Sequence, residues 1–281
     1  MNIADSLKWG KSELLIGGVE NACREAASLL SFVIGRDRTF LIAHPEYKLT
    51  RLEADEYDRV IGLRKQRVPF QHITGAQEFY GLDFKVSPDV LIPRPETELL
   101  VESAIENLGQ IPNPRFCEIG VGSGCISISV LVNLPNASCN AVDISNAALS
   151  VAAVNAMHHN VLHRLELIES DIFSELEMEK FDAILSNPPY IPLADIPSLQ
   201  AEVRDHDPKI ALTDGSDGLK IIANIVQNAP LFLKNGGFLL VEIGHDQSSE
   251  VRKMFSNEIW HSVAFLKDLQ SFDRIATAHL S

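Results

Sequence analysis

Paired cysteines, long apolar runs and an apolar leader are absent from this sequence. Its 4 cysteines lie far apart and none has the C-x-x-C spacing of a metal or redox site, so we expect buried, reduced thiols and no metal. The stretch 237–243, among the most apolar, is far shorter than the roughly 20 residues that cross a membrane. Met1 to Asp5 show neither the basic nor the apolar part of a secretory signal. We therefore expect a cytoplasmic protein without membrane contact.

Positive charge is scarce in one part of the chain. The 24 Lys and Arg residues face 38 Asp and Glu residues, for a net charge of −14. Residues 1–85 hold 12 of each sign, so the whole acidic excess falls in 86–281. An acidic region repels a phosphate backbone, which argues against nucleic acid as the main ligand. At 281 residues, without internal repeats, the chain is long enough for a small domain and a larger one, and we expect a monomer.

The apolar spacing changes twice along the chain. Residues 1–66 have three- and four-residue spacing, which predicts a small helical domain, and Thr50 with Glu53 predicts a capping box at a helix over 51–65. Alternating aromatic and β-branched residues around Gly75 predict a β-hairpin linker over 67–92. From 93 onward, strands alternate with helices such as 146–158 and 219–233, which predicts an α/β fold with a doubly wound parallel sheet. The expected strands are 116–119, 137–142, 165–169, 183–186, 238–243, 262–266 and 274–278. The last two have no helix between them and should pair antiparallel.

A glycine-rich turn follows the first strand of this sheet. The residues are Gly120, Val121, Gly122, Ser123 and Gly124, and an apolar helix comes next. Such a turn lets a ligand approach the backbone and offers it the free N–H groups of a helix start. It suits a dinucleotide, a phosphate or S-adenosylmethionine, or a tight turn alone. The third glycine comes one residue earlier than in the G-x-G-x-x-G dinucleotide pattern, which favours S-adenosylmethionine over NAD.

Acidic residues end the second and third strands. Asp143 is placed to accept hydrogen bonds from both ribose hydroxyls, or alternatively to act as a charge at a helix start. Asp171 is placed to accept from an adenine amino group, with Ile172 packed on the ring. A glycine loop followed by two acidic strand ends has the order expected for one nucleoside lying across neighbouring strand tips.

The fourth strand runs directly into Asn187-Pro188-Pro189-Tyr190. In isolation this tetrapeptide is as consistent with a rigid turn as with a site. At the C-terminal end of a central parallel strand, where ligands bind, it predicts a grip on a planar nitrogen. The Asn187 side-chain oxygen and the Pro188 carbonyl can accept the two N–H groups of an amide or aromatic amine, while Tyr190 packs on the planar group. Neither proline has an N–H to compete.

Together these segments resemble the release factor glutamine methyltransferases, the PrmC/HemK family. The resemblance covers nearly the whole chain. Beyond the glycine loop and Asn187 to Tyr190, it rests on Arg67-x-Pro69-x-Gln71-x-Ile73-x-Gly75, Phe79-Tyr80-Gly81, Ile92-Pro93-Arg94-Pro95-Glu96-Thr97-Glu98, Glu202-Val203-Arg204, Asp217-Gly218-Leu219 and Glu242-Ile243-Gly244-x-x-Gln247. Asn-Pro-Pro-Tyr alone is shared with adenine methyltransferases, whereas the linker and proline-rich segments are specific to the family.

The resemblance implies a Rossmann-like class I S-adenosylmethionine methyltransferase. Its substrate would be the glutamine N5 in the Gly-Gly-Gln motif of class 1 peptide chain release factors. Residues 1–66 would form a helical substrate-recognition domain, 67–92 the hairpin linker and 93–281 the methyltransferase domain. Expected cofactor contacts are Gly120, Val121, Gly122, Ser123, Gly124, Asp143, Asp171, Ile172 and Asn187. Expected catalytic and substrate-binding residues are Asn187, Pro188, Pro189 and Tyr190, with Arg94 as a further substrate contact.

Four positions depart from the family pattern; one of them is Asp214, since Gly-Gly is commoner where this chain has Asp214-Gly215. Three other functions compete with this interpretation. The family usually has Asp at Glu118, Thr at Val121 and often an aromatic at Ile172, which bears on cofactor affinity and leaves the amide grip intact. An adenine-N6 methyltransferase is the nearest alternative and predicts a basic groove and base flipping. A NAD-dependent oxidoreductase is disfavoured by the glycine spacing. A binding protein that keeps the fold without catalysis is disfavoured by the intact Asn-Pro-Pro-Tyr.

Overall fold

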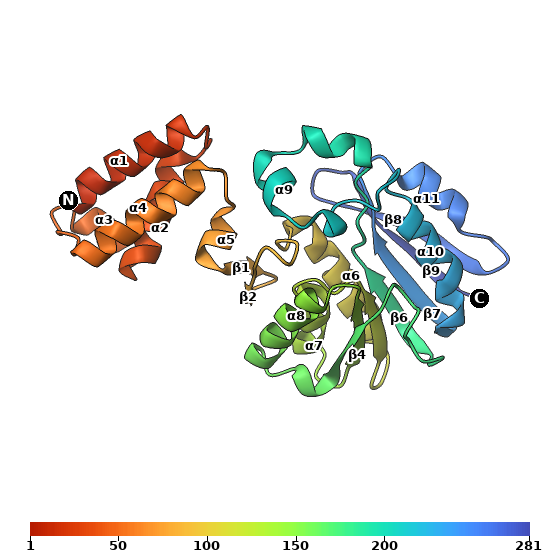
Figure 1. Cartoon of the computed structure of the whole chain (residues 1–281). Coiled ribbons are helices and arrows are strands. Elements are labelled where there is room, and N and C mark those ends of the chain that lie inside the picture. Colours follow the sequence, from red (N-terminus) through yellow and green to blue (C-terminus); the bar gives the residue numbers. More distant parts are fainter. The chain divides into compact units, whose positions relative to one another are not determined.

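The computed structural model describes residues 1–281, which form two compact units (Figure 1). Unit 1 comprises Met1–Ala76 and the short segment Gln200–His206. Unit 2 comprises Gln77–Leu199 and Asp207–Ser281. None of the helices has the length and apolar character needed to cross a membrane.

Unit 1 is built mainly from helices, and local signals set where they begin. The Thr50 side chain accepts from the Glu53 N–H while the Glu53 carboxylate accepts from the Thr50 N–H, so the predicted capping box is confirmed. The core is apolar, and its buried Tyr57 donates its hydroxyl to the Ala26 carbonyl at 3.1 Å. The helices are α1 (Ile3–Ile16), α2 (Ala22–Ile34), α3 (Arg38–Ala43), α4 (Arg51–Lys65), α5 (Phe70–Thr74) and α9 (Ala201–His206).

Helix α9 belongs to unit 1 although 124 residues separate it from Ala76 in the sequence. Arg64 of α4 links this helix to the unit. Its side chain is only 7% exposed and is paired with the carboxylates of Glu25 in α2 and Glu202 in α9. Glu202 also binds Arg67 at 2.6 Å. A buried guanidinium needs such partners, since removing its charge from water is costly. These ion pairs hold α9 to the helical unit.

The linker region differs in detail from its predicted form. We expected a ribbon centred on Gly75, but 70–74 form a helix, and Gly75 ends it in the left-handed conformation with φ of 73°. The hairpin comes later, as β1 (Ala76–Phe79) and β2 (Leu82–Lys85), with Tyr80 and Gly81 in its turn. A glycine at positive φ serves a helix end as well as a hairpin turn, so the pattern did not distinguish the two.

Unit 2 contains one seven-stranded sheet with the order β5-β4-β3-β6-β7-β9-β8. The first five strands are parallel, and β9 pairs antiparallel with both β7 and β8, as predicted for the closing pair. The central strand β6 is buried at every residue. The strands are β3 (Arg115–Ile119), β4 (Ser138–Asp143), β5 (Leu165–Glu169), β6 (Phe181–Ser186), β7 (Leu233–Glu242), β8 (Trp260–Lys267) and β9 (Asp273–Leu280).

Helices cover both faces of this sheet, so the predicted α/β doubly wound fold is confirmed (Figure 1). One apolar core includes side chains of α6 (Glu98–Leu108), α7 (Cys125–Asn133) and α8 (Asn146–His158). The other includes those of α10 (Lys220–Asn228) and α11 (Ser248–Met254). Short 3-10 helices complete the unit: η1 (Pro95–Thr97), η2 (Leu162–Arg164), η3 (Leu193–Ser198), η4 (Lys209–Ala211) and η5 (Ala229–Leu231).

The strand order determines where a ligand can bind. The chain runs outward through β3, β4 and β5, and then returns to place β6 on the other side of β3. The loops after β3 and β6 therefore leave in opposite directions and open a crevice at the carboxyl ends of these strands.

Candidate active site

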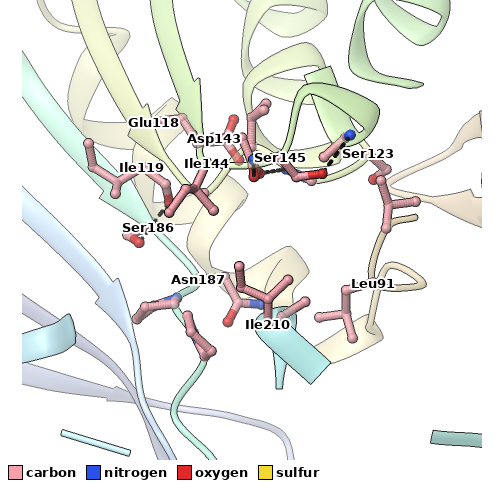
Figure 2. Close-up of a pocket in the computed structure, with 18 of the residues that line it drawn as sticks. Leu91, Glu118, Ile119, Ser123, Asp143, Ile144, Ser145, Ser186, Asn187 and Ile210 are labelled. Carbon is pink, nitrogen blue, oxygen red and sulfur yellow. Dashed lines mark hydrogen bonds between the residues drawn. The ribbon is translucent and has the colours of Figure 1, made fainter. Parts of the chain in front are cut away.

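A pocket occupies this crevice, with about 1110 Å³ of empty space that includes a part open to solvent. Figure 2 shows Glu118 and Ile119 of β3, Asp143 of β4 and Asn187 after β6 around it. Residues far apart in the sequence thus meet in one hollow because their strands end at the same edge of the sheet. The pocket is large enough for a nucleoside-sized ligand.

The glycine loop forms one wall of the pocket. Gly120 and Gly122 have φ of 77° and 53°, and a Cβ added at either would meet no atom within 4 Å. Their backbone therefore borders open space, at conformations that favour glycine. Of the residues predicted to form a cofactor loop, Gly120, Val121, Gly122 and Ser123 line the pocket, whereas Gly124 does not. A Cβ on Gly124 would lie 2.7 Å from Ile128 Cδ1 and 3.3 Å from Ala152 Cβ, so this glycine permits close packing between the start of α7 and α8.

Asp143 is held at the end of β4 by two backbone donors. Its Oδ2 accepts from the Gly122 N–H and its Oδ1 from the Ser145 N–H, both at 2.9 Å (Figure 2). Burial raises the pKa of this carboxyl, and the backbone hydrogen bonds oppose that rise. Each carboxylate oxygen can accept more than one hydrogen bond, so acceptor capacity remains for a ligand in the pocket.

Asp171 and Ile172 lie after β5 and line the same pocket. Ile172 has a φ of 55°, which is a strained conformation for a β-branched residue. Such strain persists where the surrounding structure enforces it, and it is concentrated at functional sites. The strain is consistent with a binding role for this strand end.

Glu118 is a pocket residue whose importance the sequence indicated only as a departure from a family pattern. It is fully buried, its Oε2 accepts from the Ser127 N–H at 2.9 Å, and its Oε1 has no hydrogen-bond partner. Burial raises the pKa of this carboxyl to about 8, against hydrogen bonds from Ser127 that lower it. Glu118 lines the pocket, and a cationic or hydrogen-bond-donating ligand there would offer its unpartnered oxygen a partner and favour the ionised carboxylate.

Glu118→Gln should make the ligand-free protein more stable in alkaline solution. A raised carboxyl pKa means that the folded state holds its proton more tightly, so the stability of the wild type falls as pH rises from about 4.5 through about 8. The variant should lack this fall and gain about 1–3 kcal/mol at pH 9, with little change at pH 4. Thermal unfolding at both pH values measures it. Glu106→Gln, on the exposed face of α6, is the control; equal gains in both variants would contradict the assignment.

The segment after β6 faces the glycine loop across the pocket. Asn187, Pro188 and Pro189 line it, and the Ser186 hydroxyl donates to the Ile119 carbonyl at 2.8 Å, which fixes β6 against β3 (Figure 2). The Asn187 Nδ2 donates to the Thr97 hydroxyl at 3.0 Å. Its Oδ1 is therefore the atom left to accept from a ligand.

Tyr190 does not line the pocket, unlike the three residues before it. Its ring, which was predicted to pack on the planar group of the substrate, packs against the apolar core, and its hydroxyl donates to Glu242 Oε1 at 3.1 Å. Its carbonyl accepts from Gln247 Nε2 at 2.9 Å. A Cβ on Gly218 would lie 2.0 Å from the same carbonyl, so glycine is required there for this close approach.

The remaining walls come from segments on either side of the sheet. Arg94 lines the pocket but its guanidinium is paired with the buried Asp207 at 2.6 Å, so its charge is partly neutralised. Directly after Asp207, the pocket is lined by Pro208, Ile210 and Ala211, of which Figure 2 labels Ile210. The sequence contained no motif that singles out these residues, because their place depends on how the chain folds back after α9.

Known proteins resemble this chain in both sequence and structure. Residues 5–75 match the PrmC N-terminal domain model and 95–197 the methyltransferase small domain model. A release factor glutamine methyltransferase of Geobacter sulfurreducens is 41% identical over 96% of this chain and 93% of its own. One of Cereibacter sphaeroides is 38% identical over 100% and 99%. The crystal structure of a methyltransferase from Pyrococcus furiosus matches with a TM-score of 0.53 at 16% identity, covering 72% of this chain and 90% of that one, which shows the shared fold.

Proposed function

Because the chain belongs to the release factor glutamine methyltransferase family, we propose that it transfers a methyl group from S-adenosylmethionine to the glutamine N5 of the Gly-Gly-Gln motif in class 1 peptide chain release factors. The observation that carries the proposal is the position of Asn187 to Pro189, which face the glycine loop across one pocket. A transferase needs its acceptor and its donor side by side in such an arrangement.

The residues of the pocket fit S-adenosylmethionine. Gly120 and Gly122 leave open space beside their backbone, Asp143 retains acceptor capacity, and the unpartnered Glu118 Oε1 suits a positively charged group. In the proposed complex Asp143 binds the ribose hydroxyls and Asp171 with Ile172 binds the adenine. When bound, S-adenosylmethionine supplies a methyl group made electrophilic by its sulfonium.

Asn187 and Pro188 would hold the glutamine side chain. An amide nitrogen is a poor nucleophile because its lone pair is delocalised, so its orientation decides the rate. The Asn187 Oδ1 accepts one N–H of the glutamine amide and the Pro188 carbonyl accepts the other, which directs the nitrogen lone pair along the remaining axis. The backbone of Pro188 is restricted by its own ring and by Pro189, so its carbonyl is preorganised and needs little reorganisation during the reaction.

We assign 1–66 to recognition of the release factor outside its Gly-Gly-Gln tip, 67–92 to the linker and 93–281 to methyl transfer. Unit 1 offers a helical surface and contains no part of the pocket described above. We propose that the chain acts as a monomer in the cytoplasm, where translation takes place, and that it acts on protein without binding nucleic acid directly. The acidic excess in 86–281 supports the last point.

Label transfer from S-adenosylmethionine tests this function. Purified class 1 release factor should accept about one methyl group per molecule, whereas a release factor with the motif glutamine changed to asparagine should accept none, because the shorter side chain does not reach the pocket. Duplex DNA should also remain unlabelled. Label on DNA and none on the release factor would instead support the adenine-N6 alternative, which the family relationship disfavours.

A further inference from the structure

Gln247 is a buried amide side chain that lies directly before α11. It is 7% exposed and does not line the pocket. Its Oε1 accepts from the Gly244 N–H at 2.8 Å. Its Nε2 donates to the Tyr190 carbonyl at 2.9 Å and to the Gly218 carbonyl at 3.5 Å. Two segments that are distant from Gln247 in sequence, at Tyr190 and Gly218, therefore meet at its side chain.

The partners of this amide allow only one orientation. The Gly244 N–H can only donate, so Oε1 has to face it, and the two carbonyls can only accept, so Nε2 has to face them. A turned amide would set like groups against each other and would make none of these hydrogen bonds. Burial makes such a loss costly, because water does not replace the missing partners.

Tyr190 is held at both ends of the residue. Its hydroxyl donates to Glu242 Oε1 at 3.1 Å, and its carbonyl accepts from Gln247. A Cβ on Gly218 would lie 2.0 Å from that carbonyl oxygen, so the carbonyl fits there only because Gly218 has no side chain. The next residue, Ile191, donates its N–H to the Leu212 carbonyl at 2.9 Å.

These contacts matter because they fix the end of the gripping segment, Asn187 to Tyr190. Pro188 and Pro189 have no N–H, so the middle of the segment donates no backbone hydrogen bond and its position is set from the two ends. At the start, the Asn187 Nδ2 is held by its hydrogen bond. At the end, Gln247 holds the Tyr190 carbonyl. The proline rings leave few free rotations between them, so a displacement of Tyr190 also moves the Pro188 carbonyl.

We propose that Gln247 is a positioning residue for methyl transfer: by holding the Tyr190 carbonyl it fixes the end of the gripping segment, and it thereby sets where the Pro188 carbonyl meets the substrate N–H. The inference rests on the proposed function, because this N–H belongs to the glutamine amide. Two family segments outside the pocket thus act on one carbonyl. Glu242-Ile243-Gly244-x-x-Gln247 supplies the donor, and Asp217-Gly218-Leu219 supplies the space.

Steady-state kinetics of Gln247→Glu test the proposal. The variant keeps the length and the acceptor oxygen of the side chain but places a carboxylate against the Tyr190 carbonyl. At about pH 8 its kcat should fall about 10- to 100-fold at saturating S-adenosylmethionine, while the KM for release factor changes less than about threefold. A buried carboxyl is protonated more easily and can then donate, so at about pH 6 the kcat relative to wild type should recover at least about fivefold.

Two further variants separate positioning from general damage. Asn140→Asp alters a buried amide of β4 that does not line the pocket, and it should keep the wild-type kcat at both pH values. Gly218→Ala adds a Cβ against the Tyr190 carbonyl, so it should lower kcat without recovery at low pH. It also serves if Gln247→Glu does not fold.

The anchoring itself can be followed without turnover. In ligand-free Gln247→Glu at about pH 8, hydrogen exchange at the Ile191 N–H should be at least about tenfold faster than in the wild type, whereas the Leu185 N–H of the buried strand β6 should not change. Wild-type kcat and wild-type exchange in a variant that methylates release factor would overturn the inference and leave the proposed function standing. Faster exchange at Ile191 in a protein that does not methylate release factor would contradict the proposed function and leave the anchoring standing.

Discussion

Asn187→Ala should lower kcat for release factor methylation by about 10²- to 10³-fold at saturating S-adenosylmethionine. The substitution removes Oδ1, the acceptor proposed for one amide N–H, and leaves the lone pair of the glutamine nitrogen undirected. The loss should appear in kcat, because the orientation matters most when the new bond forms. Single-turnover methylation assays measure it, and calorimetry should show S-adenosylmethionine affinity reduced by less than about tenfold.

Two further substitutions separate this role from general damage. Asn187→Asp keeps an acceptor oxygen but loses the Nδ2 donor to Thr97, so it should recover only a part of the activity. Asn228→Ala, on α10 and hydrogen-bonded only to Asn224, should behave as the wild type. Undiminished kcat in Asn187→Ala would refute the proposed grip.

Asp143→Ala should weaken S-adenosylmethionine binding by about 10²- to 10³-fold. The carboxylate is expected to accept from both ribose hydroxyls, and each hydrogen bond to a charged group contributes about 1.5–3 kcal/mol. The same oxygens hold the Gly122 and Ser145 N–H groups, so the glycine loop loses its anchor as well. Isothermal titration calorimetry measures the change, and the rise in unfolding temperature caused by the cofactor should shrink in parallel.

Asp143→Asn is the matched variant, because its shape is conserved and its single carbonyl oxygen can serve only part of these donors. It should lie between the wild type and Asp143→Ala. Asp171→Asn should have a smaller effect, since one contact to the adenine amino group is expected there. Wild-type affinity in Asp143→Ala would show that the cofactor lies elsewhere.

Much of the fold was predictable from short-range patterns. The capping box of Thr50 and Glu53 involves neighbouring residues, and so does the start of α8, where Ser145 caps the helix by accepting from Ala148. All seven expected strands are present. Runs of apolar residues marked the buried strands such as β6, whereas most residues of β8 are not buried. The prediction at Gly75 was wrong, because a glycine with positive φ has the same local pattern at a helix end and in a hairpin turn.

The sequence did not predict the order of the edge strands or the assignment of α9 to unit 1. An antiparallel closing pair was expected, but whether β8 or β9 adjoins β7 depends on side-chain packing across the sheet. Helix α9 joins unit 1 through Glu202, whose partner Arg64 is 138 residues earlier in the chain. No local signal specifies a pair at that separation.

The sequence by itself determined the family, and it predicted a cofactor loop and a substrate segment at Asn187 to Tyr190, because those features are contiguous and their chemistry depends on neighbouring backbone groups. Tertiary structure decided which of them reach the pocket: Gly124 and Tyr190 pack away from its wall, while Glu118 and Ile210 line it. It also left the Asn187 Oδ1 free to accept, because the Nδ2 of the same side chain donates to the Thr97 hydroxyl. Such relations arise only when burial brings distant segments together and leaves each polar atom a limited choice of partners.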